Sequence, residues 1–387
     1  MTKTYIRILA WLMAGIFLLL QPALAQPLES QCPLSLSAPA YILMEADTGA
    51  VIFENNADER RQTASLVKLM ALLLCMEAIE NGAVSLETQV CVSSQAAKTP
   101  GSTALLDANS TYRLEDLLRA CIVASANDAA VALAECIAGS EEAFVEKMNQ
   151  KAADLNLANT HYVNCTGLSD SKQYTTARDC AVIASALSQY PLYFTYSSLW
   201  LSHLTHPSGR VTDLTNTNRL VRFYAGCDGM KTGSSPEAKY CICATAQKDS
   251  MRLIAIVLGA DRSQVRFDEA RSMLEYGLSS YCRTTIIEKG ELTGYSLPVR
   301  NGARDRINIA AGKGLSMLLQ NGQQEQLSVE LSLPQSITAP MQSGDTVGEI
   351  HVLLNGKQIA SLPAVVSDDV RLPGFIEGFL RILSCWR

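Results

Sequence analysis

The sequence predicts an α+β fold: a domain that combines an antiparallel sheet with helices, then a small all-β domain, then a C-terminal amphipathic helix. Three observations support this fold class. Apolar residues recur at helical spacing in several segments between residues 65 and 189, and strand-like runs flank that region on both sides. Alternating apolar and polar residues dominate the chain beyond about residue 283. With 387 residues, of which 48% are hydrophobic, the chain is long enough for more than one core.

Residues 1–25 are predicted to be a signal peptide. Lys3 and Arg7 supply a positive start, Ile8–Leu20 is apolar without a charge, and Pro22–Ala25 ends with the small residues of a cleavage site. The apolar core is short, which favours cleavage over an uncleaved membrane anchor. We therefore expect the mature chain to be exported.

The mixed domain is predicted over residues 38–283. It opens with a β-hairpin, because two apolar runs flank the turn residues Glu45–Gly49. Two strands are predicted within 239–260. Helices are predicted at about 65–80, in two stretches of 113–138 that break near 125–127, and at 141–157, 176–189 and 266–278. Strands thus stand at both ends of the domain, and we expect them to share one antiparallel sheet.

Residues 284–368 are predicted to form the small all-β domain. The segments RINIAA, LSMLLQ and QLSVELSL alternate apolar and polar residues, as half-buried strands do. Asn-Gly pairs at Asn321-Gly322 and Asn355-Gly356 are typical of tight β-turns.

Residues 369–387 are predicted to form an amphipathic membrane-anchor helix. The segment is too short to span a bilayer. Its arginines outnumber the single Glu377, which suits a helix lying in the interface at the outer face of the cytoplasmic membrane. The alternative is a helix packed on the β-domain. In either case, one face of the predicted helix carries the apolar residues Phe375, Ile376, Phe379, Leu380, Ile382, Leu383 and Trp386.

Composition argues against two classes of partner. The net charge is −6 and no basic stripe with interleaved aromatic residues occurs, so we expect no nucleic acid. The four histidines are not at zinc spacing and no C-x-x-C pair occurs, so we expect neither a metal nor a cofactor. Several of the twelve cysteines lie in apolar runs, which predicts mostly free thiols with room for one or two disulfides.

The first candidate motif is Ser65-Leu66-Val67-Lys68, at the start of a predicted helix. Residues three apart share one helix face, and the amide at a helix N-terminus can donate to an anion. A neutral lysine with a lowered pKa can take the proton of a serine. Alone, the pair also fits a capping serine beside a solvated lysine.

A second motif, Ser125-Ala126-Asn127, falls at the predicted break between two helices. A hydroxyl and an amide there could relay a proton and hold a substrate amide group. Both residue types are also ordinary helix caps.

The third motif, Lys231-Thr232-Gly233, leads into a predicted strand. Lys231 would place positive charge near Lys68 and so lower the pKa of that lysine. Thr232 could bind a carboxylate, and Gly233 would let a ligand approach the strand backbone. The alternative is a turn lysine before a strand.

Taken in order, S-x-x-K, S-x-N and K-T-G form a specific set. With them, this chain resembles the low-molecular-mass penicillin-binding proteins that are serine-type D-alanyl-D-alanine carboxypeptidases. The likeness covers nearly all of the mature chain, including TNTNRLVRFYAGCDGMKTG before the third motif and APMQSGDTVGEIHVLLNGKQIASLPAVV in the β-domain. It implies a β-lactamase/transpeptidase-like fold for the mixed domain.

The resemblance also implies a mechanism. Ser65 would attack the carbonyl between the two terminal D-alanines of a peptidoglycan stem peptide, with Lys68 as general base. Ser125 would pass the proton to the leaving D-alanine, and Asn127 would hold the peptide. Water would then release the acyl-enzyme, whereas β-lactam antibiotics would stay attached to Ser65.

The substrate would be bound by groups around the third motif. The backbone amides of Ser65 and Ser234 would hold the oxyanion. Lys231, Thr232 and Arg266 would face the terminal carboxylate. The alternative for Arg266 is a surface arginine at a helix start.

Two other functions are weaker matches. A class A-like β-lactamase uses S-D-N and a separate glutamate, whereas this chain has S-A-N and no glutamate in NCTGLSDS. A catalytically silent peptidoglycan-binding protein would have no reason to keep the three motifs together. Transpeptidation shares the same acyl-enzyme and stays open.

Overall fold

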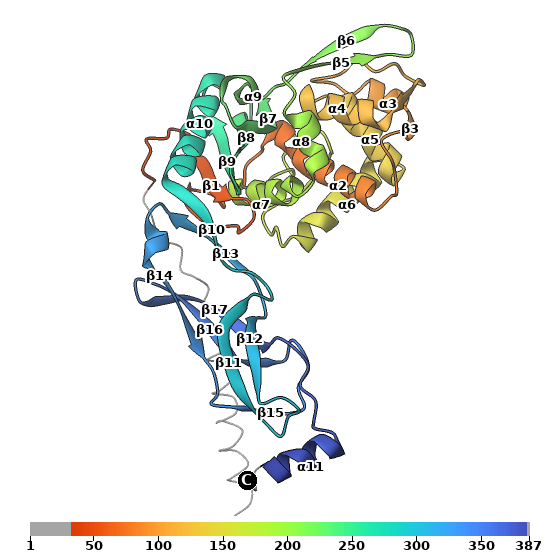
Figure 1. The fold of residues 1–387 in the computed structure, drawn as a ribbon. Coiled ribbons are helices and arrows are strands. Elements are labelled where there is room, and N and C mark those ends of the chain that lie inside the picture. Colours follow the sequence, from red (N-terminus) through yellow and green to blue (C-terminus); the bar gives the residue numbers. More distant parts are fainter. Residues whose placement is uncertain (1–31, 385–387) are drawn as a thin grey trace, which may run out of the picture. The chain divides into compact units, whose positions relative to one another are not determined.

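The structure is a computed structural model that describes residues 32–384 (Figure 1). The predicted signal peptide at residues 1–25 lies outside the described residues. The chain forms two compact units. Among the described residues, the first groups 32–293 with Ala310–Gln326, and the second groups Gly294–Ile309 with the chain from Leu327 onward.

The first unit is built on a five-stranded antiparallel sheet in the order β2-β1-β9-β8-β7. Strands β1 and β2 form the predicted hairpin, and β8 and β9 form a second one. β1 pairs with β9, so strands from both ends of the domain share one sheet, as predicted. The bounds are β1 Ala40–Glu45, β2 Val51–Asn55, β7 Cys227–Ser235, β8 Lys239–Lys248 and β9 Met251–Ala260.

Helices cover both faces of this sheet, α10 (Ser263–Ser280) on one side and α7 (Ala177–Ser188) and α8 (Pro191–Ser197) on the other (Figure 1). Alternate residues of β1 serve the two sides: Ile42 joins the core under α2 and α7, whereas Leu43 joins the core under α10. The six long helices are α2 Lys68–Glu80, α4 Leu114–Val123, α5 Asn127–Ala138, α6 Glu141–Asp154, α7 Ala177–Ser188 and α10 Ser263–Ser280. The predicted α+β fold class is confirmed.

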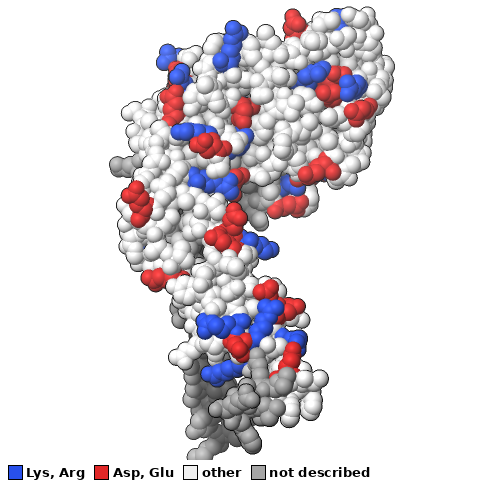
Figure 2. All heavy atoms as spheres, viewed as in Figure 1, with Lys and Arg blue, Asp and Glu red and all other residues white. Residues whose placement is uncertain are grey.

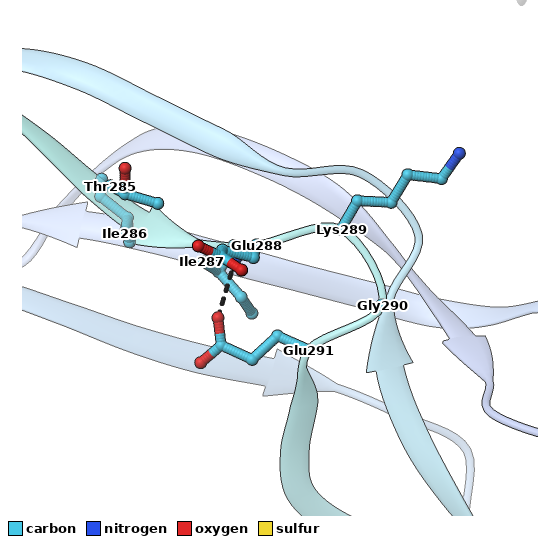
Figure 3. Close-up of a pocket in the computed structure, with 7 residues that line it drawn as sticks. All are labelled: Thr285, Ile286, Ile287, Glu288, Lys289, Gly290 and Glu291. Atoms are coloured by element: carbon cyan, nitrogen blue, oxygen red, sulfur yellow. Dashed lines mark hydrogen bonds between the residues drawn. The ribbon is translucent and has the colours of Figure 1, made fainter. Parts of the chain in front are cut away.

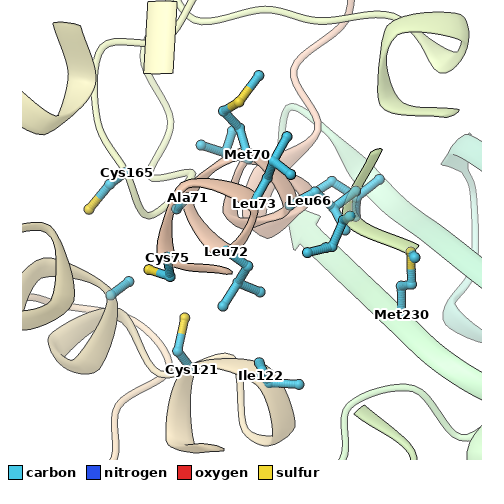
Figure 4. Packing of buried hydrophobic residues seen from close by; sticks show 14 of the residues in the cluster. Leu66, Met70, Ala71, Leu72, Leu73, Cys75, Cys121, Ile122, Cys165 and Met230 are labelled. Carbon is cyan, nitrogen blue, oxygen red and sulfur yellow. The ribbon is translucent and has the colours of Figure 1, made fainter. Parts of the chain in front are cut away.

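Helix α2 is apolar on nearly all sides and therefore lies in the middle of the core. Figure 4 shows its residues Met70 to Cys75, and Leu66 of the turn before it, surrounded by side chains from other elements, among them Cys121, Cys165 and Met230. The predicted helix from Ser65 is slightly shorter than expected, because residues Ala64–Val67 form a 3₁₀ turn (η1) and α2 begins at Lys68.

Several short elements were not predicted. They are β3 Gln89–Cys91, α3 Ser94–Ala97, β4 Thr111–Arg113, α8 Pro191–Ser197, β5 Leu201–Thr205, β6 Val211–Thr215 and α9 Leu220–Phe223. β5 and β6 form a separate hairpin whose outer residues Leu201 and Val211 are exposed.

The second unit is all-β, with a sheet in the order β14-β16-β17-β12-β11-β15. Its strands are β11 Leu292–Arg300, β12 Arg306–Ala311, β14 Leu327–Ser332, β15 Ile337–Thr338, β16 Thr346–Leu354 and β17 Lys357–Val366. Asn355 and Gly356 both have positive φ and link β16 to β17, as the Asn-Gly signal predicted.

The other Asn-Gly pair does not close a hairpin. Asn321-Gly322 follows β13 (Leu315–Gln320), which pairs with β10 (Tyr281–Ile287) in a two-stranded sheet of the first unit. A short 3₁₀ turn (η2, Gln323–Gln326) then leads into β14, whose partner is β16. Turn chemistry predicted the bend but not the strand partners, which depend on contacts distant in sequence.

The C-terminal segment contains the helix α11, Phe375–Ser384. Phe375 is 91% exposed and Ile376 73% exposed, so these side chains do not pack on the β-domain. Of the helices in residues 32–384, none is long and apolar enough to cross a membrane.

Two features of the composition can be examined in the structure: the distribution of charged residues on the surface and the state of the cysteines. On the face drawn in Figure 2, basic and acidic residues are interspersed rather than gathered by sign. The cysteines of the described chain are all free thiols, and most of them are buried.

Candidate active site

The structure brings Ser65 and Lys68 together at the junction of η1 and α2. Lys68 Nζ lies 3.2 Å from Ser65 Oγ. Ser65 is half-buried, and Lys68 has no exposed surface at all. The alternative of a solvated lysine beside a capping serine is therefore excluded.

Lys68 is held by two further acceptors. Its Nζ donates to Asn127 Oδ1 at 2.5 Å and to the carbonyl oxygen of Thr166 at 2.6 Å. A neutral amine has two N–H groups and one lone pair, and these two acceptors take both N–H groups. The lone pair then faces Ser65 Oγ, which is the geometry that a general base requires.

Burial lowers the pKa of Lys68 from its usual value to about 8. The sequence had predicted the positive charge of Lys231 as the cause of this shift, whereas burial is the largest cause. The two lysines also repel each other, and this repulsion is the second cause of the shift of Lys231. Burial and then the charge of Lys68 lower the pKa of Lys231 to about 7.

Ser125 lies in the predicted break between α4 and α5, and Asn127 is the first residue of α5. Ser125 has a positive φ of 61°, which ends one helix and lets the chain turn into the next. Its hydroxyl is buried and has no hydrogen-bond partner among the described residues. Asn127 Nδ2 donates to Pro100 O at 2.6 Å, so the side chain that orients Lys68 is itself oriented by a loop. One amide hydrogen of Asn127 remains available.

Lys231, Thr232 and Gly233 were predicted to precede a strand. They lie instead within a strand of their own, β7, which is the edge strand nearest η1. The Lys231 Nζ is fully buried and has no hydrogen-bond partner among the described residues. Gly233 was predicted to let a ligand approach the strand, but its observed contact is with the chain itself. A methyl group on Gly233 would lie 2.4 Å from Thr63 O and 3.0 Å from the Ser65 nitrogen.

The loop that presents Thr166 was not identified from the sequence. Asn164 Oδ1 accepts hydrogen bonds from Thr166 N, Thr166 Oγ1 and Gly167 N, which closes the loop into a tight turn. Gly167 has φ +86°, and a methyl group there would lie 2.1 Å from Ala64 O. Asn and Gly at positions 164 and 167 are typical of such a turn. The group that binds Lys68, however, is the backbone carbonyl of Thr166, which residue type does not reveal.

Arg266 is not a surface residue. It lies near the start of α10 and is 8% exposed, and its Nη1 donates to the carbonyl oxygens of Gly233 (2.8 Å) and Cys241 (3.2 Å). These hydrogen bonds hold the backbone of β7 at the third motif, and the guanidinium adds positive charge beside that strand. Ser234, the next residue of β7, is exposed.

The cavities differ in which predicted residues line them. A cavity of about 430 Å³ has Ser234 in its lining. A cavity of about 650 Å³ is lined by Thr285–Glu291, in the connection from β10 to β11, and holds none of the motif residues (Figure 3). Within the described chain, no group of three or more His, Cys, Asp or Glu residues could hold a metal ion.

Comparison with known proteins decides the family. The family model described as D-alanyl-D-alanine carboxypeptidase matches residues 26–262. The chain belongs to this D-alanyl-D-alanine carboxypeptidase family. A second model, the C-terminal domain of penicillin-binding protein 5, matches residues 281–371. The resemblance drawn from the three motifs is confirmed, and the protein is a serine-type carboxypeptidase of the cell wall.

Relatives of this carboxypeptidase cover almost its full length. It is 35% identical to D-alanyl-D-alanine carboxypeptidase DacF of Bacillus subtilis over 384 residues, which cover 98% of each chain. It is 34% identical to DacC of Escherichia coli, over 96% of this chain and 94% of the relative. The crystal structure of penicillin-binding protein 5 from Haemophilus influenzae aligns with a TM-score of 0.79 at 30% identity, over 88% of this chain and all of that one.

Proposed function

We propose that this carboxypeptidase removes the terminal D-alanine of peptidoglycan stem peptides with Ser65 as nucleophile and Lys68 as general base. The observation that carries the assignment is the buried amine of Lys68, with both N–H groups bound and its third position 3.2 Å from Ser65 Oγ. Because burial brings the pKa of Lys68 to about 8, about a tenth of the amine is neutral at pH 7.

In the first step Lys68 takes the hydroxyl proton of Ser65 while Oγ attacks the carbonyl carbon between the two D-alanines. The oxyanion lies between the backbone N–H groups of Ser65 and Ser234. Gly233 supports this pairing, because it brings β7 against the turn of Ser65. Each such donor is worth roughly 10²–10³ in rate.

The leaving nitrogen then needs a proton. Ser125 supplies it, since its buried hydroxyl has no partner among the described residues, and the proton that Lys68 took replaces it. The C–N bond breaks and D-alanine leaves. Water next attacks the ester, and the same proton path run in reverse frees Ser65.

The terminal carboxylate of the peptide lies against Lys231 and Thr232. Lys231 Nζ is buried without a hydrogen-bond partner among the described residues, so a carboxylate there both satisfies the amine and stabilises its protonated form. Arg266 adds positive charge through the strand. Asn127 uses its remaining amide hydrogen to hold the peptide.

β-lactam antibiotics would enter the same site, because they offer an amide carbonyl beside a carboxylate. Ser65 opens the lactam ring and the inhibitor remains as an ester. The direct test of the activity is release of D-alanine from an acylated peptide that ends in D-Ala-D-Ala. Wild-type protein should release it and Ser65→Ala should not; release by Ser65→Ala at the wild-type rate would contradict the assignment.

The C-terminal segment is proposed to hold the enzyme on the outer face of the cytoplasmic membrane. Phe375, Ile376 and Phe379 are exposed on α11, as an interfacial helix requires. Arg371 pairs with Glu377 at 2.5 Å, which offsets the acidic group of that segment and so weakens its repulsion from anionic lipids.

Export through a cleaved signal peptide is also a proposal. It rests on the sequence of residues 1–25 and on the extracytoplasmic substrate of the family. N-terminal sequencing of the mature protein should begin at Gln26. A mature chain that still carries Ile8–Leu20 would contradict cleavage.

A further inference from the structure

The proposed function sets the direction of the bound peptide along β7. The terminal carboxylate meets Lys231 and Thr232, and the carbonyl under attack meets the N–H of Ser234. β7 is the edge strand of its sheet, so an extended peptide can lie along its free edge as an added strand. Because the end of the peptide lies at residues 231–232 and the preceding carbonyl at residue 234, the peptide runs antiparallel to β7. The residues before the D-alanines then lie beside Ser235 and the turn that follows it.

Glu237 lies in that turn, between β7 and β8. Its Oε2 accepts hydrogen bonds from Ser235 Oγ at 3.0 Å and from Ser169 Oγ at 2.6 Å. Ser169 follows the loop that presents Thr166 to Lys68 and that contacts the turn of Ser65 through Gly167. The bond from Ser169 to Glu237 therefore joins the two chain segments that flank Ser65, and it fixes a carboxylate where the peptide passes.

This carboxylate is charged and lacks a cationic partner. The hydrogen bonds from Ser169 and Ser235 hold the pKa of Glu237 below its usual range. No lysine or arginine among the side chains that the structure describes, residues 32–379, forms an ion pair with it within 4.0 Å. Asp261, at the end of β9, differs in this respect, because Lys239 lies 2.5 Å from its Oδ1.

We propose that Glu237 is a specificity-determining residue that selects peptides in which the residue before the two D-alanines carries a positively charged side chain. A free side-chain amine would pair with the Glu237 carboxylate, and acylating that amine would remove the pair. The inference rests on the proposed function, because the direction of the peptide follows from the roles of Lys231, Thr232 and Ser234.

The test compares two peptides, acetyl-L-lysyl-D-alanyl-D-alanine with its side-chain amine free and the same peptide with that amine acetylated. For the wild-type enzyme we expect kcat/KM to be roughly two- to fivefold higher for the free amine, as for an exposed ion pair. The ratio should decrease as salt is added. Glu237→Gln keeps an acceptor for both serines and should bring the ratio close to one.

Two further variants sharpen the test. Glu237→Lys should reverse the preference in favour of a peptide whose side-chain amine has been succinylated. Glu288→Gln, which changes the net charge equally in the connection from β10 to β11, should leave the ratio as in the wild type. Covalent labelling by benzylpenicillin, measured for every variant, reports an intact site.

The outcomes separate the two proposals. If the wild-type enzyme releases D-alanine from both peptides at equal kcat/KM, or if Glu237→Gln keeps the wild-type ratio, the role of Glu237 is contradicted while the proposed function stands. If the wild-type enzyme releases D-alanine from neither peptide, the proposed function is contradicted, and the inference about Glu237 with it.

Discussion

A methyl group on Gly233 would lie 3.0 Å from the backbone nitrogen of Ser65, so β7 and the turn of the nucleophile meet backbone to backbone. No side chain separates the two backbones, and only glycine at position 233 permits this contact. The two N–H groups proposed to bind the oxyanion, those of Ser65 and Ser234, flank this contact. We therefore expect the geometry of this contact to affect acylation more than it affects the fold.

The substitution Gly233→Ala tests this relationship. The added methyl group should push β7 away from Ser65 and lower the acylation rate by about 10²–10³, the value of one oxyanion donor. Unfolding free energy should fall by only about 1–3 kcal/mol, as in other overpacked sites. Stopped-flow acylation by benzylpenicillin and thermal unfolding measure the two effects.

The matched control for Gly233→Ala is Gly378→Ala on α11, where a methyl group would meet nothing within 4 Å. It should acylate at the wild-type rate. If Gly233→Ala also acylates at the wild-type rate, the close contact has no part in catalysis.

The acylation rate should depend on pH through Lys68. Only neutral Lys68 can accept the Ser65 proton, and its pKa is lowered to about 8 by burial. The rate should therefore rise about tenfold per pH unit below that value and level off above it. Lys68→Arg keeps a permanent charge and should lose the reaction at every pH. A wild-type rate that stays constant from about pH 6 to about pH 9 would contradict Lys68 as the base.

The turn made by Asn164 should be needed to position the base. Asn164→Ala removes the acceptor for Thr166 N, Thr166 Oγ1 and Gly167 N, which frees the carbonyl that binds Lys68. A small displacement of a catalytic group lowers rates steeply, so we expect acylation to slow by about 10- to 100-fold. Asn159→Ala, in the loop after α6, is the control and should have no such effect. Equal rates for both variants would show that the turn is dispensable.

Membrane binding should depend on the C-terminal segment. Deleting residues 371–387 removes α11 with its exposed Phe375, Ile376 and Phe379. The shortened enzyme should stay in the supernatant when anionic vesicles are sedimented, while the mature full chain should sediment with them. Both forms should label equally with benzylpenicillin. A shortened form that still sediments would place the membrane contact elsewhere.

The sequence alone predicted the three motifs and their meeting point. Ser65 and Lys68 are close because they are neighbours on one turn, and Asn127 reaches Lys68 from the first turn of the helix that follows the predicted break. These features could be predicted because they depend only on residue type and on spacing along the chain.

Other parts of the site depend on tertiary packing and could not be predicted. Thr166 acts through its backbone carbonyl, which any residue would supply. The pKa of Lys68 was attributed to Lys231, whereas it follows from the burial of α2 within the core. The turn at Asn321-Gly322 was recognised, but the pairing of β13 with β10 depends on residues far apart in the chain.

The measurement that tests the central assignment most directly is the intact mass of residues 26–370 after incubation with benzylpenicillin, with peptide mapping of the adduct. A single stable adduct on Ser65 is expected, absent in Ser65→Ala and nearly absent in Lys68→Ala. Rapid turnover of penicillin without an adduct would indicate a β-lactamase. An adduct on another residue, or wild-type labelling of either variant, would contradict Ser65 as the nucleophile and Lys68 as its base.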